Sequence, residues 1–331
     1  MPLATILITS FEQRPFLMDA IMSATNQTVE NLEIILVTKF DAKSILSQSL
    51  TKDLRYFEVK DAKTKGALIK YGLKRARTDI IMFLDDDDVF YPDKAEYIIS
   101  IFKKNNNIGL IHNNFTRIGE SFNFNDSIQY KNDNLKNEFV CALNLREAFK
   151  KGCDRNLSSM SIRLSALNEY IERLDSIETS DDSFIFYSVY ESGFAVCYTT
   201  RQLTFYRIHT GGKTNLTGTF NVYIEKGKWK LTSDVSMHKL FLDMFNNYEI
   251  KEIQKLRLSY YRSLLYQYTD HPILLNEFLR DMINHLKFLR NYGGNNHMLL
   301  NFYLWTTMLI SRRLFLISYY LISLYRLKKY R

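Results

Sequence analysis

In the first half of the chain, short apolar runs alternate with segments whose apolar residues repeat at the spacing of an α-helix. This alternation is the feature that most restricts which fold the chain can adopt. Four runs are apolar enough for buried strands: residues 3–8, 33–37, 55–59 and 80–84. Residues 14–24 and 65–76, which lie between these runs, repeat apolar side chains at the spacing of a helix. Strands separated by helices favour an α/β fold with a mostly parallel central sheet flanked by helices.

The second half of the chain changes character near Gly218. Before that point, further strands are expected at residues 109–112, 158–163, 195–199 and 202–207, helices from Pro92 and over 164–174, and a loop or hairpin over 115–136. Residues 220–291 are almost wholly helical in period. We therefore expect an α/β domain over residues 1–218 and an all-helical region over residues 219–331.

Four consecutive aspartates, Asp85–Asp88, directly follow the apolar run 80–84. In an open α/β sheet, ligands bind at the carboxyl ends of the strands. Four carboxylates repel one another there unless a cation neutralises them, and Mg²⁺ or Mn²⁺ binds one or two carboxylates together with phosphate oxygens. The run therefore predicts a divalent-metal site that bridges to a diphosphate. The alternative, a cap for the helix that begins near Pro92, needs only one or two aspartates.

A second acidic pair, Asp181 and Asp182, precedes a segment of helical period that ends near Gly193. Taken alone, this pair is typical of an ordinary helix cap. Further on, the sequence YRIH places His209 just after the last expected strand. An isolated histidine is more often structural than a ligand, so only the combination of these elements indicates a functional site.

In this order and at this spacing, the elements resemble the family-2 glycosyltransferases with the GT-A fold, over about residues 2–213. Residues 6–37 are similar to the family's first strand, nucleotide-contacting loop, helix with a Ser-x-x-x-Gln-Thr element, and second strand. The other similar elements are AKTKG (62–66) to A-R-N-x-G, FLDDDDVFYPDK (83–94) to the DxD region, DDSFIFYSVYESG (181–193) to E-D-x-x-L…G, and YRIH (206–209) to Y-R-x-H. A DxD alone is weakly specific, whereas five elements in register are strongly specific.

The resemblance implies an enzyme that moves a sugar from a nucleotide-diphosphate sugar to an acceptor hydroxyl, with inversion and with Mn²⁺ or Mg²⁺ as cofactor. Asp182 takes the position of the catalytic base, and Asp181 replaces the family's usual glutamate. Asp87 takes the position of a metal ligand, and His209 that of a residue able to approach the metal or the diphosphate. The residues expected to contact the donor are Thr9, Phe11, Glu12, Asp61, Lys63, Gly66, Asp85 and Asp86.

The sequence departs from the family at the end of the second strand. The family usually has an aspartate there that holds the nucleobase, whereas this chain has Thr38, Lys39 and Phe40, with Asp41 slightly beyond. The choice between UDP-, GDP- and other donors therefore stays open. So does the acceptor, which is a glycan, a lipid or a protein.

Charge and cysteine content bear on partners and location. The formal charge is +8, and residues 312–331 carry only basic charges. These basic residues alternate with apolar runs, which argues against a nucleic-acid partner. The three cysteines are far apart and have no histidine at ligand spacing, so neither a zinc site nor a disulfide framework is indicated. A reducing, cytoplasmic location without a signal peptide follows as the expectation.

Two apolar segments, residues 298–311 and 314–325, flank Arg312 and Arg313 near the end of the chain. A spanning helix needs about twenty apolar residues, and neither segment reaches that length. Two interpretations remain: helices that lie in the interface of the inner face of the cell membrane, or helices that pack within the protein or in a homo-oligomer.

Two further classes of function remain as alternatives. The first is a non-catalytic, membrane-attached scaffold that keeps the glycosyltransferase fold. The second is nucleotidyl transfer, which is expected to need a glycine-rich phosphate loop near the first strand. Residues 9–14 contain no glycine, which disfavours this second alternative.

Overall fold

The computed structural model describes residues 1–46, 54–129, 137–209, 219–268, 275–292, 314, 316–318, 320 and 321. The chain divides into two compact units, Met1–Arg207 and Ile208–Arg331. The domain boundary expected near residue 218 falls at the end of the segment 210–218, outside the described residues.

The first unit is built on a nine-stranded sheet in the order β3-β2-β1-β4-β8-β6-β9-β5, with β7 paired to β9. The strands are β1 (Ala4–Ser10), β2 (Leu32–Thr38), β3 (Leu54–Glu58), β4 (Ile80–Asp85), β5 (Val89–Phe90), β6 (Ile108–Ile118), β7 (Phe139–Val140), β8 (Met160–Arg163) and β9 (Ala195–Arg207). Strands β3, β2, β1 and β4 run parallel to one another, and β8 joins them antiparallel. The parallel block brings the carboxyl ends of four strands to one edge, as the alternation of strands and helices predicts.

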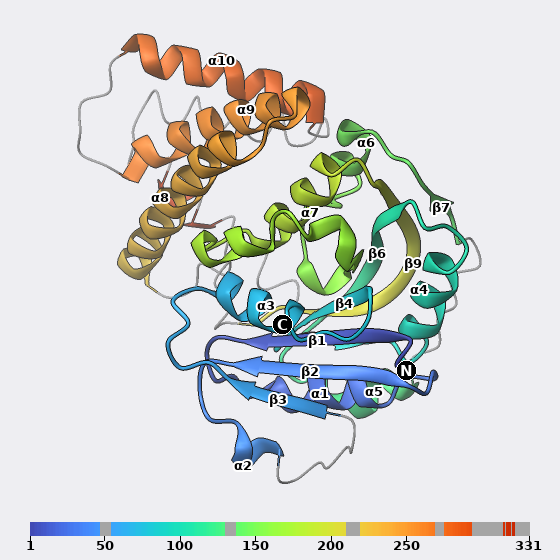
Figure 1. The fold of residues 1–331 in the computed structure, drawn as a ribbon. Helices are drawn as coiled ribbons and strands as arrows, with labels where there is room; N and C mark the ends of the chain where they lie inside the picture. Colours follow the sequence, from blue (N-terminus) through green and yellow to red (C-terminus); the bar gives the residue numbers. More distant parts are fainter. Residues whose placement is uncertain are drawn as a thin grey trace. The chain divides into compact units, whose positions relative to one another are not determined.

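Helices cover both faces of the parallel block (Figure 1). On one face, α1 (Leu17–Thr25) and α4 (Lys94–Phe102) pack their apolar stripes against alternate residues of the strands, such as Ile6 and Ile8. On the other face, α3 (Lys65–Leu73) approaches β1 closely, because a Cβ at Gly72 would lie 2.3 Å from Leu7 Cδ1. Successive strand residues point to opposite faces, so both faces of these buried strands are apolar.

The Ser-x-x-x-Gln-Thr element has a structural role at the end of α1. Ser23 Oγ accepts the backbone N–H of Phe90, and Gln27 Oε1 accepts that of Ala95 at the start of α4. Gln27 Nε2 also donates to the carbonyl oxygen of Tyr91. These bonds join α1 to the segment that follows the acidic run, and so fix where that run leaves the sheet.

Several boundaries differ from those expected. Strand β6 continues to Ile118 through the polar residues placed in a loop, and α5 (Phe124–Gln129) follows it. The helix expected over 164–174 is two 3₁₀ helices, η2 (Leu164–Leu167) and η3 (Ile171–Ser176). The two late strands are one strand, β9, whose ladder with β6 shifts register near Asn114. The remaining helices of this unit are α2 (Lys43–Leu46), α6 (Leu145–Lys150), η1 (Leu157–Ser159) and α7 (Asp181–Glu191).

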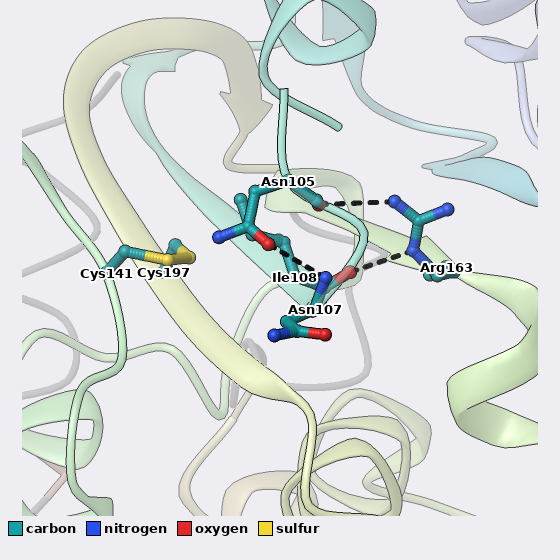
Figure 2. Close-up of a disulfide and its surroundings, with 6 residues drawn as sticks. All are labelled: Asn105, Asn107, Ile108, Cys141, Arg163 and Cys197. Atoms are coloured by element: carbon teal, nitrogen blue, oxygen red, sulfur yellow. Dashed lines mark hydrogen bonds between the residues drawn. A yellow bond between two sulfur atoms is a disulfide. The ribbon is translucent and has the colours of Figure 1, made fainter. Parts of the chain in front are cut away.

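The cysteine spacing indicated no disulfide framework, but the structure joins two of the three cysteines. β7 pairs antiparallel with β9, with Val140 opposite Tyr198. In an antiparallel pair the residue after Val140 lies opposite the residue before Tyr198, so Cys141 lies beside Cys197. Their sulfur atoms form a disulfide across this ladder, as Figure 2 shows. The two cysteines are 56 residues apart, and the strand pairing that joins them leaves no mark on cysteine spacing.

The same view shows how the loop between α4 and β6 is held (Figure 2). Arg163 of β8 donates to the carbonyl oxygens of Asn105 and Ile108, and Asn105 Oδ1 accepts the backbone N–H of Asn107. These bonds fix the loop to β8, and Arg163 Nη2 also donates to the carbonyl oxygen of Phe102, which the end of α4 leaves unpaired.

The described part of the second unit contains the long helices α8 (Phe220–Met244), α9 (Tyr248–Leu265) and α10 (Leu275–Tyr292), with η4 (Tyr266–Tyr268) after α9. The predicted apolar segment 298–311 lies outside the described residues. Among the described helices, none is both long enough and apolar enough to cross a membrane.

Candidate functional site

The four aspartates lie at the carboxyl end of β4, where the chain turns towards β5. β1 and β4 pair in parallel with Thr9 opposite Asp85, so this turn lies beside the loop that follows β1. Asp85, Asp87 and Asp88 each bring one carboxylate oxygen within 4.8 Å of the others. Three carboxylates at this spacing are a ligand set suited to Mg²⁺ or Mn²⁺.

The electrostatics of Asp88 support a cation at this position. Its side chain is 1% exposed, Oδ1 accepts the backbone N–H of Arg207 at 2.8 Å, and Oδ2 has no hydrogen-bond partner among the described residues. Burial, together with repulsion from Asp87 and Asp85, raises the pKa of Asp88 well above its usual value. A buried carboxylate oxygen without a partner is unfavourable, and a bound cation removes that penalty. The residues therefore fit a divalent ion.

Arg14, from the loop after β1, offsets part of this negative charge. Its Nη1 lies 2.6 Å from Asp87 Oδ2 and 3.2 Å from Asp86 Oδ1. Ser10 Oγ donates to the other oxygen of Asp86. Burial, reinforced by repulsion from Asp87, raises the pKa of Asp86 to about 7, and Arg14 opposes this rise. Asp86 is therefore directed to Ser10 and Arg14 and does not belong to the three-carboxylate cluster.

Arg207, the last residue of β9, holds the backbone of the acidic turn. Its side chain is fully enclosed, and Nε donates to the carbonyl oxygen of Asp87 at 2.8 Å. Nη2 pairs with Asp19 of α1 at 3.1 Å, and Nη1 donates to the carbonyl oxygen of Phe122 at 2.5 Å. The guanidinium also lies 4.3 Å from the ring centroid of Phe16. One buried cation thus fixes the turn to β9, to α1 and to the segment before α5.

Lys65, the first residue of α3, joins the acidic turn to the second acidic pair. Its Nζ lies 2.6 Å from Asp85 Oδ1 and 3.1 Å from Asp181 Oδ2. Burial disfavours the ammonium, but attraction to Asp181 and Asp85 prevails and raises the pKa of Lys65 well above its usual value. The ion pair brings the amino end of α7 next to the end of β4, although their residues are far apart in sequence.

Asp182 lies beside Asp181 and is held by backbone groups. Its Oδ2 accepts the N–H of Asn156 at 3.0 Å, and its Oδ1 accepts that of Ser183 at 2.7 Å. Asn156 (φ 61°) and Ser180 (φ 62°), which precedes α7, are both left-handed without being glycine. Such conformations are costly and cluster at functional sites. Burial, with repulsion from Asp181 second, raises the pKa of Asp182 to about 7.

The ends of β1 and β2 meet in an aromatic and cationic pair. Phe11 follows β1, and Lys39 Nζ lies 4.4 Å from its ring centroid. Thr9 is buried in β1, whereas Glu12 is exposed. Lys39 thus follows β2, where the resemblance implies a carboxylate for the nucleobase, and its ammonium lies against the Phe11 ring.

Asp61, Lys63 and Gly66, three of the expected donor contacts, lie just before and within the first turn of α3. Asp61 and Lys63 line a groove of about 450 Å³ beside the outer face of α3, together with Lys70 and Arg75, and none of the four consecutive aspartates lines it. Gly66 has a packing reason to be glycine, because a Cβ there would lie 2.2 Å from the carbonyl oxygen of Leu174.

His209 belongs to the second unit, just beyond Arg207. Its contribution to the metal site therefore stays a prediction.

Sequence reasoning missed the three cations of this site, Arg14, Lys65 and Arg207. Lys65 carried a usable signal, because a cation in the first turn of a helix opposes the helix dipole. A locally unfavourable residue of this kind indicates a tertiary or functional reason. Arg207 also had a signal, as the arginine of the Y-R-x-H element, but it was given no role. Arg14 had none, because its carboxylate partners lie far away in sequence.

Comparison with known proteins agrees with the motifs. The model of the family described as Glycosyl transferase family 2 matches residues 5–171, just over half of the 331-residue chain. A relative described as an uncharacterized glycosyltransferase of Rickettsia bellii is 33% identical over 110 residues, which are 32% of this chain and 16% of the relative. The chain thus matches less than a fifth of that relative's length.

Two solved structures resemble the fold over most of their length. TarS (residues 1–349) of S. aureus in complex with UDP-GlcNAc has a TM-score of 0.52 at 10% identity, covering 88% of this chain and 82% of that one. The mannosyltransferase PcManGT of Pyrobaculum calidifontis in complex with GDP-Man and Mn²⁺ has a TM-score of 0.54 at 12% identity, covering 98% and 88%. At these identities the likeness concerns the fold, and it confirms the expected α/β class.

Proposed function

Because the chain belongs to glycosyl transferase family 2, we propose that it transfers a sugar from a nucleotide-diphosphate sugar to an acceptor hydroxyl. One observation carries the proposal: the cluster of Asp85, Asp87 and Asp88 at the end of a central parallel strand, with Asp181 tied to it through Lys65. In this proposal, the acidic cluster is a cation site that lies beside a second acidic site, at the edge where α/β sheets bind ligands.

The proposed cofactor is Mn²⁺ or Mg²⁺, held by Asp87 with Asp85 and Asp88, and approached by His209. When bound, the ion supplies electrostatic stabilisation of the charge that develops on the leaving nucleoside diphosphate. PcManGT holds Mn²⁺ together with GDP-Man, which makes Mn²⁺ the first ion to test.

Asp182 is the proposed base, which accepts the proton of the acceptor hydroxyl as that oxygen attacks the anomeric carbon. A single displacement inverts the anomeric configuration. The backbone N–H groups of Asn156 and Ser183 orient the carboxylate, and burial gives it a pKa suited to accepting a proton near neutral pH. Lys65 and Arg14 hold positive charge beside the acidic turn, which favours a diphosphate there.

The donor contacts expected from the family remain part of the proposal, with Phe11 and Lys39 as the pair nearest the nucleobase position. TarS holds UDP-GlcNAc and PcManGT holds GDP-Man, so both nucleotide classes belong in a donor panel. The proposed acceptor is a glycan, a lipid or a protein, and the proposed location is cytoplasmic, at the inner membrane face. Asp85, Asp87 and Asp182 are all present, so nothing favours the scaffold alternative.

A donor panel tests the proposed function. Purified protein with Mn²⁺ or Mg²⁺ is incubated with UDP- and GDP-sugars, and release of the nucleoside diphosphate is followed, with donor binding measured in parallel. We expect one donor to bind and to release its nucleotide, and chelation to abolish the release. Absence of metal-dependent binding for every donor would contradict the proposal.

The pH dependence of turnover follows from Asp182. A base acts only when ionised, so kcat/KM is expected to rise about tenfold per pH unit below pH 7 and to level off above it. The pKa of Asp86 is also raised to about 7, so the Asp86→Asn variant is the matched control. That variant should keep the rise; losing it would assign the titration to Asp86.

A further inference from the structure

Helix α10 packs in the second unit with a polar face inward. Asp281 is fully buried and accepts a bond from Arg262 of α9 at 2.7 Å. Asn284 donates to Ser259 of α9 at 3.2 Å, and His285, also fully buried, packs edge-on against the ring of Tyr260. The face that contacts α9 therefore carries an acid, an amide and an imidazole, and one buried aromatic ring, that of Phe288, stacks on Tyr260.

The opposite face of α10 is apolar and exposed. Leu279, Ile283 and Leu286 follow the i, i+4, i+7 spacing of one helical stripe, and they are 40%, 52% and 38% exposed. A helix on a water-facing surface normally has the reverse distribution, with apolar residues inward. We call these three residues the α10 stripe. Its exposure indicates that another apolar phase covers it.

Cations accompany the α10 stripe. Arg280, Lys287 and Arg290 are exposed and, by helical geometry, fall within or along one side of the stripe. Among the described residues of α10, the one exposed acid is Glu277, near the amino end, because Asp281 is buried. Long basic side chains beside an apolar stripe can extend to phosphate headgroups while the stripe enters the acyl region. A protein interface, by contrast, is depleted in lysine.

A second short stripe has the same character. Leu314, Ile317 and Leu321 are exposed at helical spacing, while Leu316 packs against Leu231 and Leu264. The sequence places Arg312 and Arg313 directly before it. Exposed apolar residues next to cations therefore recur in the second unit.

We propose that the α10 stripe, with its flanking cations, binds the surface of an anionic membrane. The proposal goes beyond the transfer reaction and assigns a specific face of the molecule to lipid. It uses no residue of the proposed catalytic site, so its failure and the failure of the proposed function are separable.

Vesicle flotation of the full chain tests the surface. We expect binding to phosphatidylcholine vesicles that contain phosphatidylglycerol, and at least a tenfold loss of partitioning in the triple variant Leu279→Asn, Ile283→Asn, Leu286→Asn. The triple variant Arg280→Gln, Lys287→Gln, Arg290→Gln should lose about fivefold per cation on anionic vesicles, with little change on neutral ones. Nucleotide release in solution should be unchanged in both variants.

The controls are exposed residues of the first unit. Leu3→Asn, Ile128→Asn, Val140→Asn matches the apolar change, and Lys43→Gln, Lys103→Gln, Lys104→Gln matches the charge change. Undiminished vesicle binding in both α10 variants would overturn the proposal, as would equal losses in the controls. Light scattering without lipid measures whether the protein is a monomer or a dimer. A dimer that the apolar variant dissociates, without vesicle binding by the wild type, would show that a second copy covers the stripe and would also overturn the proposal.

Discussion

Replacing Asp182 with asparagine is expected to lower kcat by about 10³-fold, with donor affinity nearly unchanged. The substitution keeps the volume of the side chain but removes the only group assigned to accept the acceptor's proton. One of the two backbone donors, Asn156 N–H or Ser183 N–H, then faces an amide NH₂, which costs stability of about 1–3 kcal/mol. Thermal unfolding should therefore accompany the kinetics, and rates should be compared well below the melting temperature.

Asp181→Asn is the control variant that distinguishes loss of the base from a general loss of negative charge at this position. Asp181 is the neighbouring carboxylate, and it pairs with Lys65, which in turn pairs with Asp85. Its loss is expected to change donor affinity more than kcat, because it releases the ammonium beside the donor-facing turn. A larger fall in kcat for Asp181→Asn than for Asp182→Asn would exchange the roles of the two residues.

The position of the acidic run could be predicted from the sequence because it depends on local pattern. An apolar run of strand length followed at once by aspartates places them at the carboxyl end of a buried strand. β4 ends at Asp85, and the cluster lies where that pattern predicts.

The contacts that organise the site could not be predicted, because each joins distant parts of the chain. Lys65 lies between Asp85 and Asp181, and Arg207 reaches Asp87 and Asp19. The packing of α3 against the sheet and the place of β9 within it decide these pairs. The Cys141–Cys197 disulfide has the same origin, in the pairing of β7 with β9.

Polar residues inside β6 caused the clearest error in the fold. Asn113 is fully buried, and its Nδ2 donates to Asn114 O and to Thr204 Oγ1 of β9. A sequence pattern treats such residues as loop formers because asparagine favours turns. Here Thr204 of β9 accepts a bond from the Asn113 amide nitrogen, and the strand continues to Ile118.

Replacing Asp87 with asparagine is expected to weaken Mn²⁺ binding by at least about 100-fold, because ligand charge largely sets the affinity of carboxylate sites. Turnover should fall with it. Binding of Mn²⁺, followed by electron paramagnetic resonance or calorimetry, gives a readout that does not depend on finding the acceptor. Asp86→Asn is the matched control, since Asp86 bonds to Ser10 and Arg14 outside the three-carboxylate cluster. Equal affinities in the two variants would contradict the assignment of Asp87.

The cations around the cluster allow a second test, of whether a metal ion or the protein's own side chains neutralise the diphosphate. Arg14 already lies 2.6 Å from Asp87, and Lys65 lies 2.6 Å from Asp85, so a divalent ion has to displace or share these carboxylates. If chelation removes Mn²⁺ and turnover survives, neutralisation of the leaving diphosphate belongs to Arg14 and Lys65, and Arg14→Gln should then reduce turnover more than chelation does. If chelation abolishes turnover, Arg14→Gln should tighten Mn²⁺ binding, because a competing cation has been removed from Asp87. The Arg14→Gln variant thus separates the two kinds of site. Lower turnover indicates a site that uses its own cations, and tighter Mn²⁺ binding indicates a metal-dependent one.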